Sequence, residues 1–335
     1  MINPTVSVLG AGGWGTALAL LLARSDREIR LWGHDPVHVE NMVREGINTK
    51  YLPGVVLPST IKPTADLLSA AQSDILFLAI PSRYLEVIAS QLAAVCGDRN
   101  PLLVSCTKGI ELERGLLMSQ VIAEGMPSAT IAVLSGPNLA GEIARGIPAA
   151  GVIGCDDAAK LLSVQELFVG TSFRAYTSSD VRGIQLGGAL KNIFAIAAGV
   201  SDGLGLGENA RTGLVTRSLT EMTRLGMVMG GSRETFGGLS GIGDLMVTCF
   251  SPRSRNHQVG FRLGQGESLE SIISSMGSMV AEGVPTTFSA QAAAGRLSVE
   301  TPIIDEVSAL LQGLKTPAAG MKSLMGRNLR GEEEV

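Results

Sequence analysis

The sequence predicts two domains, in which an N-terminal doubly wound α/β sheet precedes an all-α C-terminal domain. The chain has 335 residues, short apolar runs alternate with helical segments in its first half, and strand-like runs stop after about Ser178. One domain commonly contains about 100–200 residues, so this length favours two. We expect them to comprise residues 1–178 and 179–335.

The expected strands are apolar throughout, which is typical of parallel strands that helices cover on both faces. Helical segments separate them, and this alternating order favours a doubly wound parallel sheet. The strands are expected at Val6–Gly10, Ile29–Trp32, Ile75–Ile80, Leu102–Cys106, Ile131–Leu134, Ala150–Ile153 and Phe173–Tyr176. Helices are expected between them at Trp14–Arg24, Arg83–Val95 and Ala158–Phe168.

The second half contains helical segments with Gly or Pro between them. Residues Ser178–Asp180 can cap the first of these helices, which places the domain boundary near this point. The helices are expected at Val181–Val200, Arg211–Met229, Leu269–Met276, Thr286–Gly295 and Ile303–Leu311.

Composition excludes several classes of function. The formal net charge is −4 without a long basic run, which argues against a nucleic-acid partner. The most apolar segment, Ile184–Val200, is interrupted by Lys191 and Asn192, so no membrane span is expected. The 4 cysteines lack the spacing of a metal site. The first apolar run, Val6–Leu9, leads directly into glycines, so it is expected to be a strand and not a signal peptide. We therefore expect a cytoplasmic protein without a metal site.

Residues Gly10–Gly15 follow the GxGxxG pattern between an expected strand and an expected helix. In that context Gly10 allows the tight turn, Gly12 lets a pyrophosphate approach the backbone, and Gly15 permits close packing of helix and strand. The helix N-terminus attracts phosphate groups. These features predict a Rossmann-like site for a dinucleotide.

The tip of the second expected strand bears on the choice of dinucleotide. An acidic residue there favours NAD, and a cation favours NADP. The strand ends in Gly33-His34, and the next acid, Asp35, precedes Pro36 and is expected to cap a helix. His34 and Arg30 tolerate a 2′-phosphate, so the sequence favours NADPH while leaving NADH open.

Lys191 is the most informative candidate for catalysis, because its helix is apolar nearly all round and should be buried. Burial lowers a lysine pKa toward neutrality, where the group can exchange a proton. Gly187 and Gly188 leave a helix face on which a ligand can lie. The alternatives are an ion-paired or snorkelling lysine and glycines that serve helix packing.

Other polar residues can complete the site. Lys108 follows the fourth expected strand, where it can depress the pKa of Lys191 and polarise a carbonyl group. Asp244 and Thr248 lie one helical turn apart, so Asp244 can orient Lys191 or bind a hydroxyl group. Arg255 presents a fork that suits a phosphate, with Ser254 and Asn256 beside it.

Two further segments are candidates. The turn at Ser135–Asn138 follows the fifth expected strand and can present backbone N–H groups to a ligand. Residues Val280–Gly283 have the character of a mobile lid, and such segments close over active sites.

These motifs together resemble the bacterial NAD(P)-dependent glycerol-3-phosphate dehydrogenase family, over about Val6 to Arg327. Their order and spacing are more specific than the glycine pattern alone. The motifs are GAGGWGTALA (10–19), LWGHD (31–35), TKGIE (107–111), SGPN (135–138), QLGGALKNIFAIAAG (185–199), GIGDLMVTC (241–249), SRN (254–256) and EG (282–283).

The resemblance implies that Lys191 is the proton donor and acceptor in the interconversion of dihydroxyacetone phosphate and sn-glycerol 3-phosphate. It also implies a homodimer, no metal, and a role in glycerophospholipid synthesis. The implied substrate contacts are Lys108, Gly136, Asn138, Lys191, Asp244, Ser254, Arg255 and Asn256. The implied cofactor contacts are Gly13, Trp14, His34, Lys108, Gly136, Ala140, Arg255, Val280 and Glu282.

Two other functions remain open. A dehydrogenase of the same architecture can act on a 3-hydroxy acid or on ketopantoate with a lysine at the domain junction. Alternatively, a regulatory protein can bind NAD(P)H without any turnover. Activity on dihydroxyacetone phosphate distinguishes the first function from both alternatives.

Overall fold

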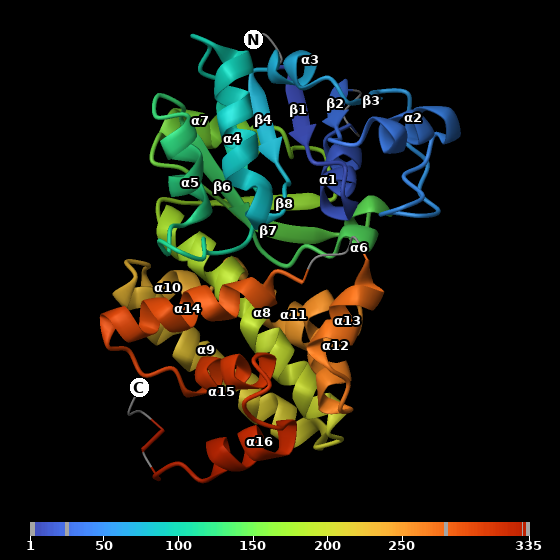
Figure 1. Cartoon of the computed structure of the whole chain (residues 1–335). Helices are drawn as coiled ribbons and strands as arrows, with labels where there is room; N and C mark the ends of the chain where they lie inside the picture. Colours follow the sequence, from blue (N-terminus) through green and yellow to red (C-terminus); the bar gives the residue numbers. More distant parts are fainter. Residues whose placement is uncertain (1–3, 24–26, 278–280, 330, 333–335) are drawn as a thin grey trace. The chain divides into compact units, whose positions relative to one another are not determined.

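The computed structural model describes residues 4–23, 27–277, 281–329 and 331–332, which form two compact units (Figure 1). The α/β unit contains the described residues up to Thr107 together with Met118–Val181. The helical unit contains Lys108–Leu117 and the described residues from Arg182 onward.

Residues 108–117 therefore do not belong with the N-terminal domain, to which the sequence analysis assigned them. Their packing gives the reason. Ile110 and Leu117 are buried in the hydrophobic core of the helical unit, and the Ile110 carbonyl accepts a hydrogen bond from Ser289 Oγ at 3.0 Å. Lys108 thus begins a short segment that is part of the helical unit.

Over the described residues, eight strands form one sheet in the order β3-β2-β1-β4-β5-β6-β7-β8. The central strands β1, β4 and β5 are buried at every position, which confirms that both faces of the sheet are covered. The strands are β1 (Val6–Leu9), β2 (Ile29–Trp32), β3 (Ile61–Thr64), β4 (Ile75–Leu78), β5 (Leu102–Ser105), β6 (Ile131–Ser135), β7 (Ala149–Gly154) and β8 (Phe173–Ser178).

The sheet is parallel, as predicted, at every described pair except one, because β6 and β7 run antiparallel. The connection between β6 and β7 contains only the short helix α6 (Ala140–Ala144), which packs against α1 (Gly13–Ala23). This connection does not return the chain to the starting end of β6, as a parallel crossover requires.

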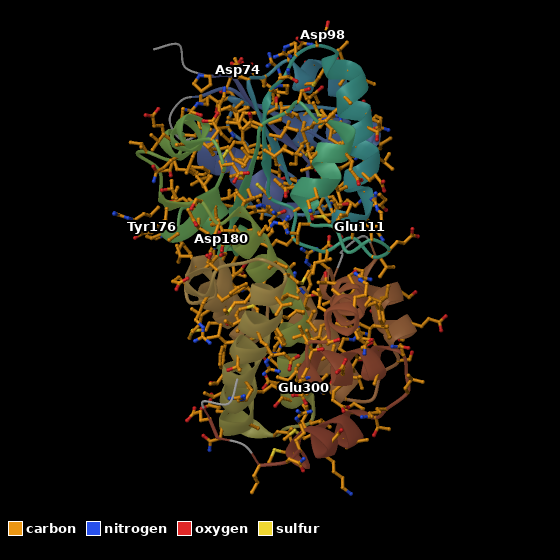
Figure 2. The ribbon with its side chains drawn as sticks, turned by 90° about the vertical axis from the view of Figure 1, so that its left-hand side faces the viewer. Asp74, Asp98, Glu111, Tyr176, Asp180 and Glu300 are labelled. Carbon is orange, nitrogen blue, oxygen red and sulfur yellow. The ribbon has the colours of Figure 1, made fainter. Side chains whose placement is uncertain are left out.

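Two details of the sheet escaped the sequence analysis. Strand β3 contains Pro63 and lies at the edge of the sheet, where proline is tolerated. Asp74, labelled in Figure 2, fixes the start of the β1–β4 pair, since its Oδ2 accepts hydrogen bonds from Thr5 N and Thr5 Oγ1 at 2.9 and 2.8 Å. The remaining helices of this unit are α2 (Pro36–Glu45), α3 (Leu67–Ala71), α4 (Ser82–Cys96), α5 (Met118–Gly125) and α7 (Ala158–Glu166).

The helical unit is built around α8 (Val181–Gly203), whose residues Gly183–Gly199 are buried. Among the described helices, α8 alone has the length and composition of a membrane span, but 89% of its apolar window is buried inside the fold, as in a core helix. The other helices are α9 (Gly207–Val228), α10 (Arg233–Phe236), the π-helix η1 (Leu239–Gly243), α11 (Asp244–Phe250), α12 (Arg255–Gly264), α13 (Leu269–Met276), α14 (Gly283–Leu297), α15 (Pro302–Leu311) and α16 (Pro317–Met325).

Glycines bring the backbones of α8 and α12 into direct contact. A Cβ atom on Gly260 would lie 1.9 Å from the carbonyl oxygen of Ile196, and one on Gly199 would lie 2.1 Å from that of His257. Any larger side chain would push the helices apart. This packing holds the first turn of α12 against α8, which carries Lys191.

Candidate active site

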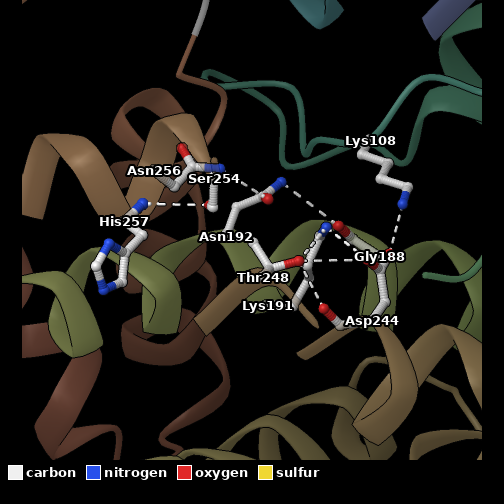
Figure 3. Close-up of polar contacts among 9 residues, drawn as sticks. All are labelled: Lys108, Gly188, Lys191, Asn192, Asp244, Thr248, Ser254, Asn256 and His257. Atoms are coloured by element: carbon white, nitrogen blue, oxygen red, sulfur yellow. Dashed lines mark hydrogen bonds and ion pairs between the residues drawn. The ribbon is translucent and has the colours of Figure 1, made fainter. Parts of the chain in front are cut away.

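Lys191 is buried in the middle of α8, as the apolar character of the helix predicts, and 7% of the residue is exposed. Its Nζ donates hydrogen bonds to Asp244 Oδ1 and to Thr248 Oγ1, both at 2.7 Å (Figure 3). The lysine is therefore ion-paired, which was one of the alternatives that the sequence left open. Its partners are two residues that the sequence analysis had placed on one helix face.

Burial lowers the pKa of Lys191 from its ordinary value to about 8. The negative charge of Asp244 opposes this shift, and the positive charge of Lys108 adds to it. A group with such a pKa is mostly protonated at neutral pH and can still release its proton.

Asp244 lies between two ammonium groups. Its Oδ1 accepts from Lys191, and its Oδ2 accepts from Lys108 Nζ. Asp244 is 1% exposed, whereas 20% of the Lys108 side chain is exposed. The Thr248 hydroxyl donates its own proton to the Asp244 carbonyl at 2.6 Å, so its oxygen is oriented to accept from Lys191.

The π-helix η1 directly before Asp244 was not foreseen from the sequence. Its Gly243 N–H bonds the Gly238 carbonyl, five residues back, at 3.1 Å. A Cβ on Gly241 would lie 2.1 Å from Phe236 O, so only glycine allows this packing. Such irregular turns are frequent at functional sites.

Gly187 does not leave the open helix face that the sequence analysis expected. A Cβ there would lie 2.5 Å from the Ser240 carbonyl oxygen, so Gly187 lets α8 pack against η1. The alternative of a packing glycine is correct at this position. Its effect is still local to the site, because it holds Asp244 beside Lys191.

Asn192 is a site residue that the sequence analysis missed. Its Oδ1 accepts from Asn256 Nδ2 at 2.9 Å, and Asn256 Oδ1 accepts from Gly283 N at 2.9 Å. This chain of amides joins α8, α12 and the start of α14. Figure 3 shows its link between Asn192 and Asn256. The signal was available, because Asn192 is a polar residue next to Lys191 in an otherwise apolar stretch.

The first turn of α12 carries the predicted phosphate anchor. Ser254 is its N-cap, and its Oγ accepts a hydrogen bond from His257 N at 3.3 Å. Arg255 follows at the first helical position and is exposed. Nearby atoms displace water and lower the pKa of Arg255, while the charge of Glu282 opposes that shift. A cation at a helix N-terminus is suited to a phosphate group.

The glycine-rich turn of the α/β unit has the geometry of a dinucleotide site. Gly10 has φ 115°, and a Cβ on it would lie 2.4 Å from Ala79 O. A Cβ on Gly15 would lie 1.9 Å from Gly10 O, whereas one on Gly12 would meet nothing within 4 Å. The turn is therefore closed toward the sheet and open at Gly12, as approach of a pyrophosphate requires. Gly13 and Trp14 begin α1 behind it.

The helix cap expected just after the tip of β2 is confirmed. Asp35 is the N-cap of α2, and its Oδ1 accepts from Val37 N and His38 N at 3.1 and 3.2 Å. These backbone hydrogen bonds lower the pKa of Asp35. His34, one residue earlier, is exposed.

The turn after β6 contains a further polar side chain, that of Asn138. Both polar atoms of the Asn138 side chain, Nδ2 and Oδ1, are buried without a hydrogen-bond partner in the described part of the chain. Buried amides rarely lack partners, so Asn138 is a candidate for a ligand contact. Gly136 has φ 134°, and Ala140 begins α6.

Two of the remaining predictions concern Val280 and Glu282. Val280 lies outside the described residues. Glu282 stands at the N-cap position of α14, directly before Gly283. Within the described residues, no group of three or more His, Cys, Asp or Glu side chains is arranged to hold a metal.

Comparison with known proteins identifies the family. Residues 5–161 match the N-terminal part of NAD-dependent glycerol-3-phosphate dehydrogenase, and residues 180–322 match its C-terminal part. The chain belongs to this family. It is therefore an NAD(P)-dependent oxidoreductase of the glycerol-3-phosphate dehydrogenase type.

Relatives of this family match along their whole length. Glycerol-3-phosphate dehydrogenase (NAD(P)+) of Geobacter sulfurreducens is 44% identical, and the match covers 99% of both chains. The enzyme of Thioalkalivibrio sulfidiphilus is 43% identical, with 99% of this chain and 100% of the relative covered. The crystal structure of glycerol-3-phosphate dehydrogenase from Coxiella burnetii superposes with a TM-score of 0.93 at 36% identity, covering 97% of this chain and 99% of the other.

Proposed function

We propose that this glycerol-3-phosphate dehydrogenase reduces dihydroxyacetone phosphate reversibly to sn-glycerol 3-phosphate with Lys191 as proton donor and acceptor. One observation carries this assignment. The Lys191 ammonium is buried, has a pKa of about 8, and is held by Asp244 and Thr248. A proton exchanger for a secondary alcohol needs a pKa close to the working pH and a fixed position.

The division of roles follows from the charges. NAD(P)H, when bound, supplies the hydride that adds to the ketone carbon. Lys191 donates a proton to the oxygen that becomes the hydroxyl group, and in the reverse direction neutral Lys191 accepts that proton. Lys108 stabilises the negative charge on this oxygen, and Asp244 holds both ammonium groups in place.

Arg255 is the proposed anchor for the substrate phosphate. Its support is the place of Arg255, an exposed residue at the first position of α12, between Ser254 and Asn256 in the sequence. Binding the phosphate fixes the distance from the carbonyl group to Lys191. We assign further substrate contacts to Gly136, Asn138 and Thr248, and the unpartnered amide of Asn138 supports this assignment most directly.

The glycine-rich turn is the proposed site of the cofactor pyrophosphate. The opening at Gly12 and the helix N-terminus at Gly13 support this. We favour NADPH over NADH, because Asp35 is engaged as a helix cap while His34 is exposed at the strand tip. The other proposed cofactor contacts are Gly10, Trp14, Gly15, Lys108, Ala140, Arg255, Val280 and Glu282.

We further propose a cytoplasmic homodimer that supplies glycerol phosphate for glycerophospholipid synthesis. In this proposal, residues 1–107 and 118–178 form the cofactor domain. Residues 179–335, together with Lys108–Leu117, form the domain for substrate and dimerisation. All four cysteines are buried thiols, which supports a reducing compartment.

An absorbance assay at the nicotinamide band tests the activity. We expect oxidation of NADPH, and more slowly of NADH, when dihydroxyacetone phosphate is added. The control substrate is 2-ketopantoate, which lacks the phosphate and should give no turnover. Turnover of 2-ketopantoate alone, or cofactor binding without turnover of either ketone, would contradict the proposal.

A further inference from the structure

Asn48 lies beneath the glycine-rich turn and is completely buried, with 0% of the residue exposed. It follows α2 in the sequence, far from the turn. Its Nδ2 donates to Ala11 O at 2.9 Å and to Thr16 Oγ1 at 2.7 Å. Its Oδ1 accepts from Tyr51 N at 3.3 Å. The amide therefore joins the turn, the start of α1 and its own loop.

The contact to Ala11 has a consequence for the neighbouring N–H group. The carbonyl of Ala11 and the N–H of Gly12 belong to one peptide unit, which is trans and planar. The two groups therefore point in opposite directions. Because Asn48 holds the carbonyl toward the interior, the Gly12 N–H points away from Asn48. The space beside Gly12 is open, since a Cβ added there would meet nothing within 4 Å.

The contact to Thr16 fixes the helix that follows. Thr16 is also 0% exposed, and its backbone N–H bonds Gly12 O at 2.9 Å. One amide group of Asn48 thus holds residues on both sides of Gly12.

The loop that carries Asn48 is itself held in place. Ile47 forms an antiparallel bridge with Val56, and Leu52 N bonds the Asn48 carbonyl at 2.8 Å. Tyr51 lies so close to the turn that a Cβ on Gly13 would be 3.0 Å from its carbonyl oxygen. The donor group of Asn48 is therefore positioned by rigid neighbours, as a support for a binding site must be.

We propose that Asn48 is a positioning residue for the dinucleotide, which keeps the Gly12 N–H directed at the pyrophosphate. This inference rests on the proposed function of the turn. Asn48 touches neither the nicotinamide nor the substrate. Its loss changes the affinity for the shared pyrophosphate part of NADPH and NADH, and has much less effect on the proton transfer at Lys191.

The decisive variant is Asn48→Asp, which keeps the size of the side chain. It replaces the donor by a carboxylate oxygen that faces the Ala11 carbonyl. Because a charge-bearing acceptor there destabilises the turn, we expect the Kd of NADPH, NADH and ADP-ribose to rise together by roughly 10- to 100-fold. kcat at saturating cofactor should fall far less than the Kd rises, and the KM for dihydroxyacetone phosphate should change little.

Thr16 gives a second, milder test. Thr16→Val removes one of the two acceptors of Asn48 and should raise the Kd by roughly 3- to 10-fold. Thr16→Ser retains the hydroxyl group and should restore the wild-type Kd. If Asn48→Asp does not fold, this pair of variants decides the question by itself.

The matched control is Ser7→Ala, which removes a buried hydrogen bond of 2.8 Å from Ser7 Oγ to the Ala70 carbonyl in the same unit. It should lower the melting temperature without changing the Kd of any dinucleotide. Wild-type Kd values in Asn48→Asp and Thr16→Val, despite lowered melting temperatures, would overturn the role of Asn48. Failure of the wild-type protein to bind either dinucleotide would instead refute the proposed function of the turn.

Discussion

The Lys191 ammonium lies 2.7 Å from one carboxylate oxygen of Asp244 inside the helical unit. The other oxygen of that carboxylate bonds Lys108. Because each of the three charges acts on the other two, the proton affinity of Lys191 depends on all of them. The Asp244 carboxylate favours the charged form of the buried Lys191. The charge of Lys108 has the opposite effect and lowers the pKa of Lys191.

Replacing Lys191 with alanine should remove the proton donor while leaving the glycine-rich turn intact. We expect kcat for dihydroxyacetone phosphate to fall by about 10²–10⁴. The Kd of NADPH, measured by fluorescence titration, should remain within about twofold of the wild-type value. A variant that retains wild-type turnover would show that another group transfers the proton.

The pH dependence of the two directions should be opposite. Lys191 has a pKa of about 8, so its ammonium is present below that pH and is lost above it. Reduction of dihydroxyacetone phosphate needs the ammonium, and its kcat should decline as the pH rises through about 8. Oxidation of glycerol 3-phosphate needs the neutral amine and should increase over the same range. Profiles of kcat that stay flat in both directions from about pH 6 to about pH 10 would contradict the assignment of Lys191 as the proton donor and acceptor.

Single substitutions at the two neighbours should move this pKa in opposite directions. The charge of Asp244 raises the pKa of Lys191, so Asp244→Asn should shift the decline of the reduction rate to lower pH. The charge of Lys108 lowers it, so Lys108→Met should shift the decline to higher pH. Both variants should also be slower than the wild type. Shifts of the same sign in the pH–rate profiles would disprove the proposed coupling.

Arg255→Lys should act mainly on substrate binding. A single ammonium replaces the planar fork that suits a phosphate, so we expect the KM for dihydroxyacetone phosphate to rise by roughly 10-fold or more, with a smaller loss in kcat. Arg253→Lys, an exposed residue two positions earlier, is the matched control. An unchanged KM in Arg255→Lys would place the phosphate elsewhere.

Glu221 in α9 should make stability depend on pH. Its buried carboxylate accepts from Ile303 N and Ile304 N, both at 2.9 Å, at the start of α15. Burial raises its pKa to about 7, against the opposing effect of these two hydrogen bonds. From its ordinary pKa up to about 7, the folded state binds more protons than the unfolded state, so stability decreases as the pH rises through this window.

The glutamine side chain of the Glu221→Gln variant cannot ionise, so this variant lacks the dependence of stability on pH. The variant loses part of the hydrogen bonding to α15 at every pH, so it should be less stable than the wild type at pH 5. That deficit should shrink by about 1–3 kcal/mol at pH 8, because only the wild type is destabilised by ionisation there. Urea unfolding at both pH values measures the change, and a deficit that is equal at the two would exclude the raised pKa.

Local patterns were enough to predict several elements. Helix α13 was expected at Leu269–Met276 and is found there, and strand β2 was expected at Ile29–Trp32 and is found there. In both elements apolar residues recur at the spacing of that secondary structure, and polar residues or glycines mark the ends. Strand β3 was missed, since a strand at the edge of a sheet needs neither apolar residues nor free backbone donors at every position.

The candidate site also has features that local patterns predict and features that they do not. The residue types of Lys191, Asp244 and Thr248 and their spacing indicated a buried ammonium with polar neighbours on one helix face. The π-helix before Asp244 and the packing role of Gly187 could not be predicted, because each depends on a backbone that approaches from elsewhere in the chain. The same is true of the contacts of Asn192 and Asn48, whose partners are distant in sequence.

The sequence by itself determined the family, the two kinds of domain, and the buried position of Lys191, since these depend on hydrophobic periodicity and on motifs that are local in the chain. The tertiary structure decided which residues share a hydrogen bond with that lysine, which unit contains Lys108, and the direction of β7. These outcomes depend on packing between segments far apart in the chain, and packing depends on shape, which a one-dimensional pattern does not contain.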